Sequence, residues 1–189
     1  EALPRWTSMA EYMAALEATA KPVNVAPLVG HGTLRLATVG RDNRPATAEE
    51  MAAMERLLRE SLGVGAFGMS TGLYFAPGMY APSEELVALM RIVASQGALM
   101  ASHIRDEGTY TVGFIPAVEE IISLGRASGC PVHFSHMKAH GPEVWGSSAR
   151  VLEMIETARE EGIEVSLDQY PYEASGGGMV PDSLPPDAS

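Results

Sequence analysis

The chain has 189 residues, of which 46% are hydrophobic and 20% charged, the composition of a globular protein with one sizeable core. No apolar run reaches the roughly 18 residues that a membrane span requires. The formal net charge of -11 disfavours nucleic acid and membrane as partners and favours a small-molecule substrate. The single cysteine, Cys130, excludes a disulfide framework and, with no signal peptide in the sequence, predicts a cytoplasmic location.

Five helices are predicted from the spacing of apolar residues and from helix start and stop signals. The second has the clearest start, because Thr47 and Glu50 have the spacing of a capping box. In chain order, the helices lie around Ser8–Thr19, over Thr47–Ser61, and after start signals at Ser83, at Pro116, and at Ser147 or Ser148.

Each of the last four helices is expected to stop at a glycine that is followed by a short apolar run. The glycines are Gly63, Gly97, Gly129 and Gly162, and the runs are VGAFGMS, ALMASH, CPVHFSH and IEVSLDQY. A fifth run, VNVAPLVGH, follows the first helix. Alternation of helices and buried strands is typical of βαβ units and parallel sheets. We therefore predict an α/β fold with about five parallel strands, either a partial (β/α)8 TIM-type barrel or an open five-stranded sheet.

Polar residues close the predicted strands, and in chain order they are His31, Ser70, His103, His136 and Asp168. Barrels and open α/β sheets both place their chemistry at this end of the strands. His103 and His136 end adjacent strands in the same inward register, so we expect their imidazoles to converge as zinc ligands. Because catalytic zinc normally has three protein ligands, Asp168 and His31 are the further candidates.

A polar group surrounds the two histidines and predicts a substrate site, and Asp106 and Glu107, just past His103, belong to it. Lys138 is placed to pair with a substrate carboxylate. Tyr170 or Tyr172 could donate a hydrogen bond to a carbonyl oxygen or a developing oxyanion. Arg105 and Ser70 complete the predicted set of substrate-binding residues.

A catalytic or metal-binding role is disfavoured for three residues, Ser70, Cys130 and His133. Ser70 stands in a G-x-S-x-G sequence, but a serine nucleophile of that type needs a helix directly after it, and the loop LYFAPGMYAP follows instead. Cys130 should lie at the opposite end of its strand from His136, as a small buried residue. His133 has the opposite strand parity to His136 and is expected to face the helices.

Five segments together resemble an N-acyl-D-amino-acid deacylase (D-aminoacylase) of the amidohydrolase superfamily. The resemblance extends from about Trp6 to Ser175, and the segments are VNVAPLVGHGTLR, GAFGMSTGLYFAPGMYA, ASHIRDE, HFSHMKAHG and DQYPYEAS. It implies a metal-dependent barrel that cleaves the amide bond of an N-acyl-D-amino acid into a carboxylate and a D-amino acid.

The resemblance also implies roles for individual residues. His103 and His136 match the two strand-end histidines that hold Zn2+ in this family. Lys138, and Tyr170 or Tyr172, match residues that contact the substrate.

The family pattern is only partly present. The HxH pair of the first barrel strand, the metal-bridging cysteine and the catalytic aspartate of the last strand have no counterpart in this sequence. We therefore expect residues 1–175 to be the central part of the barrel and residues 176–189 to be an irregular tail, a truncated continuation. The general-base aspartate is expected outside this chain. The segment alone is expected to be weakly active or inactive, with exposed sheet edges that favour self-association.

Three alternatives remain at the level of sequence. The first is another amidohydrolase, such as a cyclic-amide hydrolase of the dihydroorotase type. The second is a hydrolase that uses Ser70 as its nucleophile. The third is a non-catalytic α/β binding module.

Overall fold

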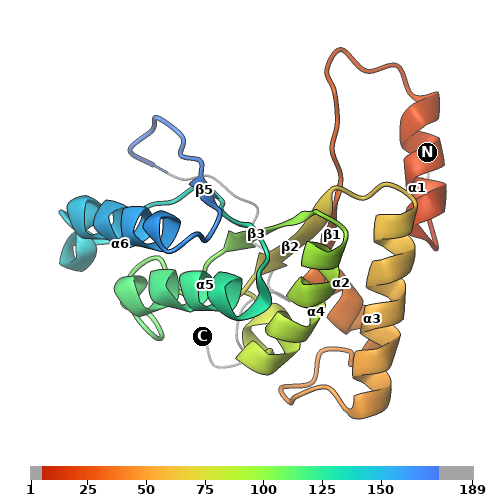
Figure 1. Cartoon of the computed structure of the whole chain (residues 1–189), viewed down its shortest axis with the longest axis horizontal. Coiled ribbons are helices and arrows are strands. Elements are labelled where there is room, and N and C mark those ends of the chain that lie inside the picture. Colours follow the sequence, from red (N-terminus) through yellow and green to blue (C-terminus); the bar gives the residue numbers. More distant parts are fainter. Residues whose placement is uncertain (1–5, 175–189) are drawn as a thin grey trace.

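The computed structural model describes residues 6–174, which form a parallel sheet of five strands with helices packed against it (Figure 1). The strands, which neighbour one another in chain order, are β1 (Leu28–Gly30), β2 (Gly68–Gly72), β3 (Leu99–His103), β4 (Val132–Phe134) and β5 (Val165–Leu167). The α-helices are α1 (Met9–Ala18), α2 (His31–Thr38), α3 (Ala48–Gly63), α4 (Ser83–Ser95), α5 (Phe114–Ser128) and α6 (Ser148–Glu160). The predicted α/β fold with five parallel strands is confirmed, and the predicted tail lies outside the described residues.

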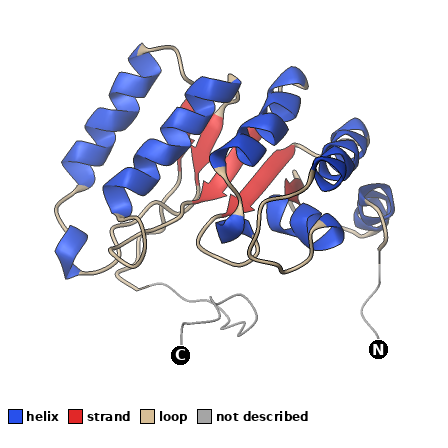
Figure 2. Ribbon diagram, turned by 90° about the horizontal axis from the view of Figure 1, so that it is seen from below, coloured by secondary structure: helices blue, strands red, loops and turns tan. Residues whose placement is uncertain are grey.

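Helices cover one face of the sheet, and Figure 2 shows them gathered on one side of the strands. The strand side chains that point to this face form the core with the helices, and Met69, Met100, Val132 and Phe134 are each at most 1% exposed. Because side chains alternate along a strand, the residues between them point to the opposite face. The sheet therefore has one buried face and one open face.

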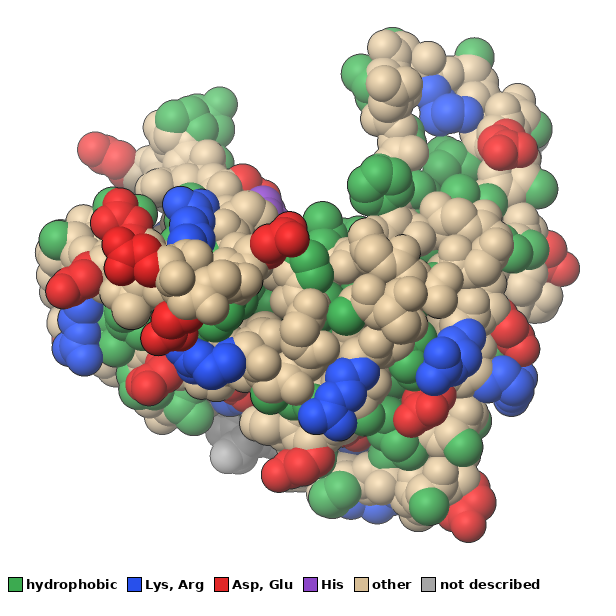
Figure 3. Space-filling model, viewed as in Figure 1, with side chains coloured by type: hydrophobic (Ala, Val, Ile, Leu, Met, Phe, Trp, Pro, Cys, Tyr) green, Lys and Arg blue, Asp and Glu red, His purple; other side chains and the backbone are tan. Residues whose placement is uncertain are grey.

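The open face borders a hollow in the molecule. Figure 3 shows this hollow between the part that carries α6 and the part that carries α1, with a histidine at its rim. Ser70, Ala101, His133 and Ser166 are aligned with one another across β2, β3, β4 and β5 and lie on the open face. No helix in residues 6–174 is long and apolar enough to cross a membrane.

The helix boundaries follow the predicted signals with some corrections. Thr47 Oγ1 accepts a hydrogen bond from the Glu50 amide at 3.2 Å, and Glu50 accepts one from the Thr47 amide at 2.8 Å, so the capping box is confirmed. Gly129 has a φ of 70°, a left-handed conformation that lets α5 end and the chain turn into β4. Helix α5 begins before Pro116, at Phe114, and Ser83 is the first residue of α4 rather than its cap.

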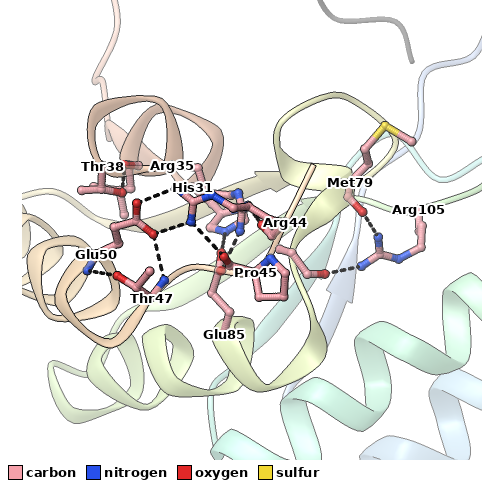
Figure 4. Close-up of polar contacts among 12 residues, drawn as sticks. His31, Arg35, Thr38, Arg44, Pro45, Thr47, Glu50, Met79, Glu85 and Arg105 are labelled. Atoms are coloured by element: carbon pink, nitrogen blue, oxygen red, sulfur yellow. Dashed lines mark hydrogen bonds and ion pairs between the residues drawn. The ribbon is translucent and has the colours of Figure 1, made fainter. Parts of the chain in front are cut away.

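Helix α2 was not predicted, and it changes the interpretation of His31. The chain enters α2 directly after β1, and His31 is fully buried at its first position. Its Nε2 atom donates to Glu85 Oε1 of α4 at 2.8 Å, and Arg35 Nη1 donates to Glu85 Oε2 at 2.6 Å (Figure 4). His31 therefore ties α2 to α4, and it is not part of the His, Cys, Asp and Glu cluster that the described residues form.

Candidate metal centre

The C-terminal ends of β3 and β4 bring His103 and His136 together. His103 is the last residue of β3, and His136 lies two residues beyond β4. Nδ1 of His103 is 3.3 Å from Nε2 of His136, and the two ring centroids are 4.8 Å apart. Two nitrogens that each lie about 2.05 Å from a tetrahedral zinc ion are about 3.3 Å from one another. The separation of the two rings therefore fits two ligands of one metal ion.

His136 reaches this position by a different route from the one predicted. The strand ends at Phe134, and His136 has a φ of 40°, the only positive φ of a non-glycine residue in the described chain. His136 therefore lies outside the alternation of side chains along β4, and the face to which a β4 residue points cannot be counted from it. Val132 and Phe134 point into the core, so His133 points to the open face, and the prediction that it faces the helices is wrong.

Glu107 completes a three-residue cluster with the two histidines. Its Oε1 atom lies 3.3 Å from Nδ1 of His136 and 3.8 Å from Nδ1 of His103. One ligand atom from each of the three residues can be chosen so that all lie within 4.8 Å of one another. The sequence placed Glu107 in the polar group around the two histidines, four residues after His103, but gave no reason to assign it a role as a ligand.

Lys138 places a positive charge beside this cluster. Its Nζ atom lies 2.5 Å from Glu107 Oε1, 2.9 Å from Nδ1 of His136 and 2.8 Å from the His136 carbonyl oxygen. The same ammonium group is 5.6 Å from the centre of the Tyr170 ring, within the range of a cation–π contact. The Tyr170 hydroxyl is buried and has no hydrogen-bond partner among the described residues.

The environment of His103 favours its neutral form. Burial lowers the pKa of His103 to about 4, and the neighbouring His136 and Lys138 act in the same direction while Glu107 opposes them. A neutral imidazole has a free lone pair and is the form that binds metal ions. His103 is therefore ready to accept a cation at neutral pH.

The other predicted site residues lie in different surroundings. Arg105 donates to the Glu120 carboxylate and to the carbonyl oxygens of Met79 and Ala81, so its guanidinium braces the loop after β3 against neighbouring segments (Figure 4). Ser70 lies on the open face of β2. Tyr172 is 73% exposed.

Cys130 and Asp168 lie outside the cluster of His103, Glu107 and His136. Cys130 is 1% exposed just before β4, where burial raises the pKa of its thiol to about 12, so the prediction of a small buried residue is confirmed. Asp168 accepts hydrogen bonds on both carboxylate oxygens, from the His136 amide and from the His133 ring.

Aromatic residues that the sequence analysis missed flank the histidine pair. The Phe75 ring is 5.0 Å and the Tyr74 ring 6.1 Å from the ring of His103, measured between centroids. Tyr110 packs against Tyr74 at 6.3 Å. These rings come from the loops after β2 and β3 and give the cluster an apolar side wall.

The chain was compared with known proteins by sequence and by structure, and both comparisons found similar proteins. No protein-family model matches it. Three proteins of Alcaligenes xylosoxydans xylosoxydans align with 90–95% of the chain: an N-acyl-D-glutamate deacylase (44% identical), a D-aminoacylase (42%) and an N-acyl-D-aspartate deacylase (41%). The chain is homologous to the N-acyl-D-amino-acid deacylases. It spans about a third of the length of these relatives, 34–36%.

Solved structures agree with this relationship. The N-acyl-D-glutamate deacylase from Bordetella bronchiseptica, complexed with zinc and a phosphonate inhibitor, superposes with a TM-score of 0.84 at 44% identity. The superposition covers 90% of the chain described here and 35% of the Bordetella chain. An L-hydantoinase from Arthrobacter aurescens superposes with a TM-score of 0.55 at 16% identity, over 87% of this chain and 37% of that one, which shows a shared fold only. The predicted partial (β/α)8 TIM-type barrel is confirmed.

Proposed function

We propose that residues 1–175 are the central part of a zinc-dependent N-acyl-D-amino-acid deacylase. The complete enzyme hydrolyses the amide bond of an N-acyl-D-amino acid to a carboxylate and a D-amino acid. The observation that carries this proposal is the 3.3 Å separation of His103 Nδ1 and His136 Nε2 at adjacent strand ends, in a chain 44% identical to a deacylase.

The residues around the histidine pair fit a zinc ion. His103 is held in its neutral form, and Glu107 lies 3.3 Å from the ring nitrogen of His136 that faces away from His103. A metal-binding histidine commonly donates that second N–H to a carboxylate. Zinc, when bound, supplies a Lewis acid for the acyl carbonyl and for the attacking water.

The substrate is held by groups on the same side of the barrel. Lys138 pairs with the carboxylate of the amino acid, exchanging its 2.9 Å contact with His136 for a contact with the substrate. Tyr170, whose hydroxyl has no partner among the described residues, donates to the acyl oxygen. Tyr172, Ser70 and Arg105 remain proposed substrate contacts.

The general base is proposed to lie outside this chain. The two aspartates near the cluster have their carboxylate oxygens engaged: Asp168 as described above, and Asp106 by the amides of Gly108, Thr111 and Gly113. Hydrogen bonds to the ionised form lower the pKa of Asp168, and they outweigh burial to lower that of Asp106, so both carboxylates are poor proton acceptors. This supports a complete active site that needs a further aspartate, and a segment that is weakly active or inactive alone.

Three further proposals concern the surroundings of the protein. We propose a cytoplasmic location. The net charge of -11 supports a protein that binds neither nucleic acid nor membrane. Within residues 6–174, β1 and β5 each pair with one strand only, which supports self-association of the isolated chain through its sheet edges.

The test uses the complete enzyme and three N-acetyl-D-amino acids, those of glutamate, aspartate and a neutral residue. We expect hydrolysis of at least one of them, loss of activity with a chelator and recovery with added zinc. Turnover of dihydroorotate or a hydantoin instead would favour a cyclic-amide hydrolase. Resistance to the chelator together with inhibition by a serine-directed reagent would favour Ser70. Absence of any turnover would favour a binding module.

A further inference from the structure

The backbone of His136 has an unusual conformation that its neighbours must maintain. Its φ of 40° lies in the left-handed region, which is sterically unfavourable for residues other than glycine and persists only where surrounding contacts hold it. The turn is nevertheless what directs the His136 ring toward His103. Whatever fixes this turn also fixes the separation of the two candidate ligands.

Asp168, at the end of β5, holds the turn at three points. Its Oδ1 atom accepts a hydrogen bond from the His136 amide at 2.6 Å. Its carbonyl oxygen accepts one from the Met137 amide at 2.9 Å, and its own amide donates to the Phe134 carbonyl at 3.1 Å. The side-chain contact is the one that acts on His136 itself, and it is the one that a substitution can remove.

The Asp168 carboxylate is itself held in place. Its Oδ2 atom lies 2.7 Å from Nε2 of His133, and Nδ1 of the same ring lies 2.8 Å from Ser166 Oγ. His133 and Ser166 are paired in register on β4 and β5, so both side chains stand on the open face. The result is a continuous line of hydrogen bonds from Ser166 through His133 and Asp168 to the backbone of His136.

We infer that Asp168 and His133 are positioning residues for the metal centre: they hold the left-handed turn at His136 and thereby set its ring against that of His103. This inference rests on the proposed metal-binding function. This role differs from that of a third ligand, because each carboxylate oxygen of Asp168 accepts a hydrogen bond and Asp168 lies outside the cluster of His103, Glu107 and His136. Loss of the carboxylate frees the His136 backbone to relax, and the two ring nitrogens separate.

Asparagine at position 168 is an informative replacement. Its carbonyl oxygen still accepts from the His136 amide, and its NH2 group donates to Nε2 of His133 when that ring carries its proton on Nδ1. Asp168→Asn therefore preserves the line of hydrogen bonds, whereas Asp168→Ala breaks it. The matched control is Glu50→Ala on α3, which removes a carboxylate that also bridges a backbone amide and a side chain, those of Thr47 and Arg44.

The experiment measures Zn2+ binding to this chain by calorimetry, with folding of each variant checked by circular dichroism. We expect Asp168→Ala to weaken binding about 10- to 100-fold, the usual cost of removing a partner of a metal ligand. Asp168→Asn and Glu50→Ala should bind like the wild type. If Asp168→Ala does not fold, His133→Ala replaces it, and it should also weaken binding because it frees one oxygen of the carboxylate.

A second readout needs no metal. The NMR signal of the His136 amide proton, which donates the 2.6 Å bond to a carboxylate, should lie downfield in the wild type and move upfield in Asp168→Ala. A folded Asp168→Ala variant with wild-type affinity, or with an unmoved amide signal, overturns this inference and leaves the proposed function intact. A wild-type chain that binds zinc no better than a His103→Ala/His136→Ala variant also overturns the inference, whereas the proposed function fails only if the complete enzyme shows no chelator-sensitive hydrolysis.

Discussion

The carboxylate of Glu107 and the ring of His136 face one another, with 3.3 Å between Oε1 and Nδ1. The other nitrogen of that ring faces His103. Glu107 is buried and its charge is shared with Lys138, which lies 2.5 Å away. Once the Lys138 ammonium, 2.9 Å from Nδ1, turns to another partner, the carboxylate is placed to accept the Nδ1 proton of His136, which leaves the Nε2 lone pair for a metal ion.

Glu107→Gln should therefore weaken zinc binding by about tenfold or more without abolishing it. Glutamine has nearly the same shape, so the loop keeps its fold. It lacks the negative charge that Glu107 places beside His136 and Lys138. Calorimetric titration with Zn2+ measures the effect. Glu84→Gln, which removes an exposed carboxylate on α4, is the control, and equal affinities for the two variants would exclude a role for Glu107.

The two ligands proposed here differ from the other histidines in a way that can be tested. His103→Ala and His136→Ala should each remove bound zinc after dialysis, because a single remaining imidazole is a weak site. His140→Ala should retain it, since His140 is exposed in the loop after β4 and packs on Tyr110. Metal analysis of the dialysed proteins gives the result. Zinc retained by either ligand variant at the wild-type level would contradict the assignment.

Lys138 should affect substrate binding more than metal binding. In the complete enzyme, Lys138→Met should raise KM about 100-fold, the effect of losing a charge-assisted hydrogen bond of about 3 kcal/mol to the substrate carboxylate. Zinc content should stay unchanged. Steady-state kinetics with an N-acetyl-D-amino acid and its methyl ester provide the check. A variant that loses activity equally on the acid and on the ester would show that Lys138 does not bind the carboxylate.

Periodicity and glycine stops predicted the repeating architecture because they are local properties of the sequence. The capping box at Thr47, the helix end at Gly129 and the parallel strand order all follow from signals that a few residues carry. The convergence of His103 and His136 was predicted correctly because the carboxyl ends of parallel strands meet at one edge, although the shared strand register that was also expected ends with β4 at Phe134.

The parts that were missed depend on contacts between distant segments or on single backbone angles. Helix α2 begins without a side-chain cap, and it is stabilised by the contacts of His31 and Arg35 with Glu85, about 50 residues away. The predicted orientation of His133 was wrong because it was counted from His136, which lies beyond the end of β4 in a left-handed conformation. A histidine in a sequence does not by itself indicate a positive φ.

The buried contacts of Glu85 predict how stability changes with pH. Burial alone would raise the pKa of Glu85, but hydrogen bonds from His31 and Arg35 outweigh it, and the pKa is lowered. A carboxyl whose pKa is lower in the folded state stabilises the protein above its unfolded pKa of about 4.3. That stabilisation is lost as the pH falls from this value through the folded-state pKa.

Glu85→Gln should therefore lower the free energy of unfolding by about 3 kcal/mol at pH 7, because Arg35 stays buried without a counter-charge. The difference from the wild type should shrink as the pH falls below about 4 and through the lowered folded-state pKa, where the wild-type carboxyl also becomes neutral. Urea denaturation at several pH values measures both quantities. Glu84→Gln, one residue earlier and exposed, should change stability little at any pH. A deficit in Glu85→Gln that stays constant down to the acid limit would show that the carboxylate charge does not stabilise this network.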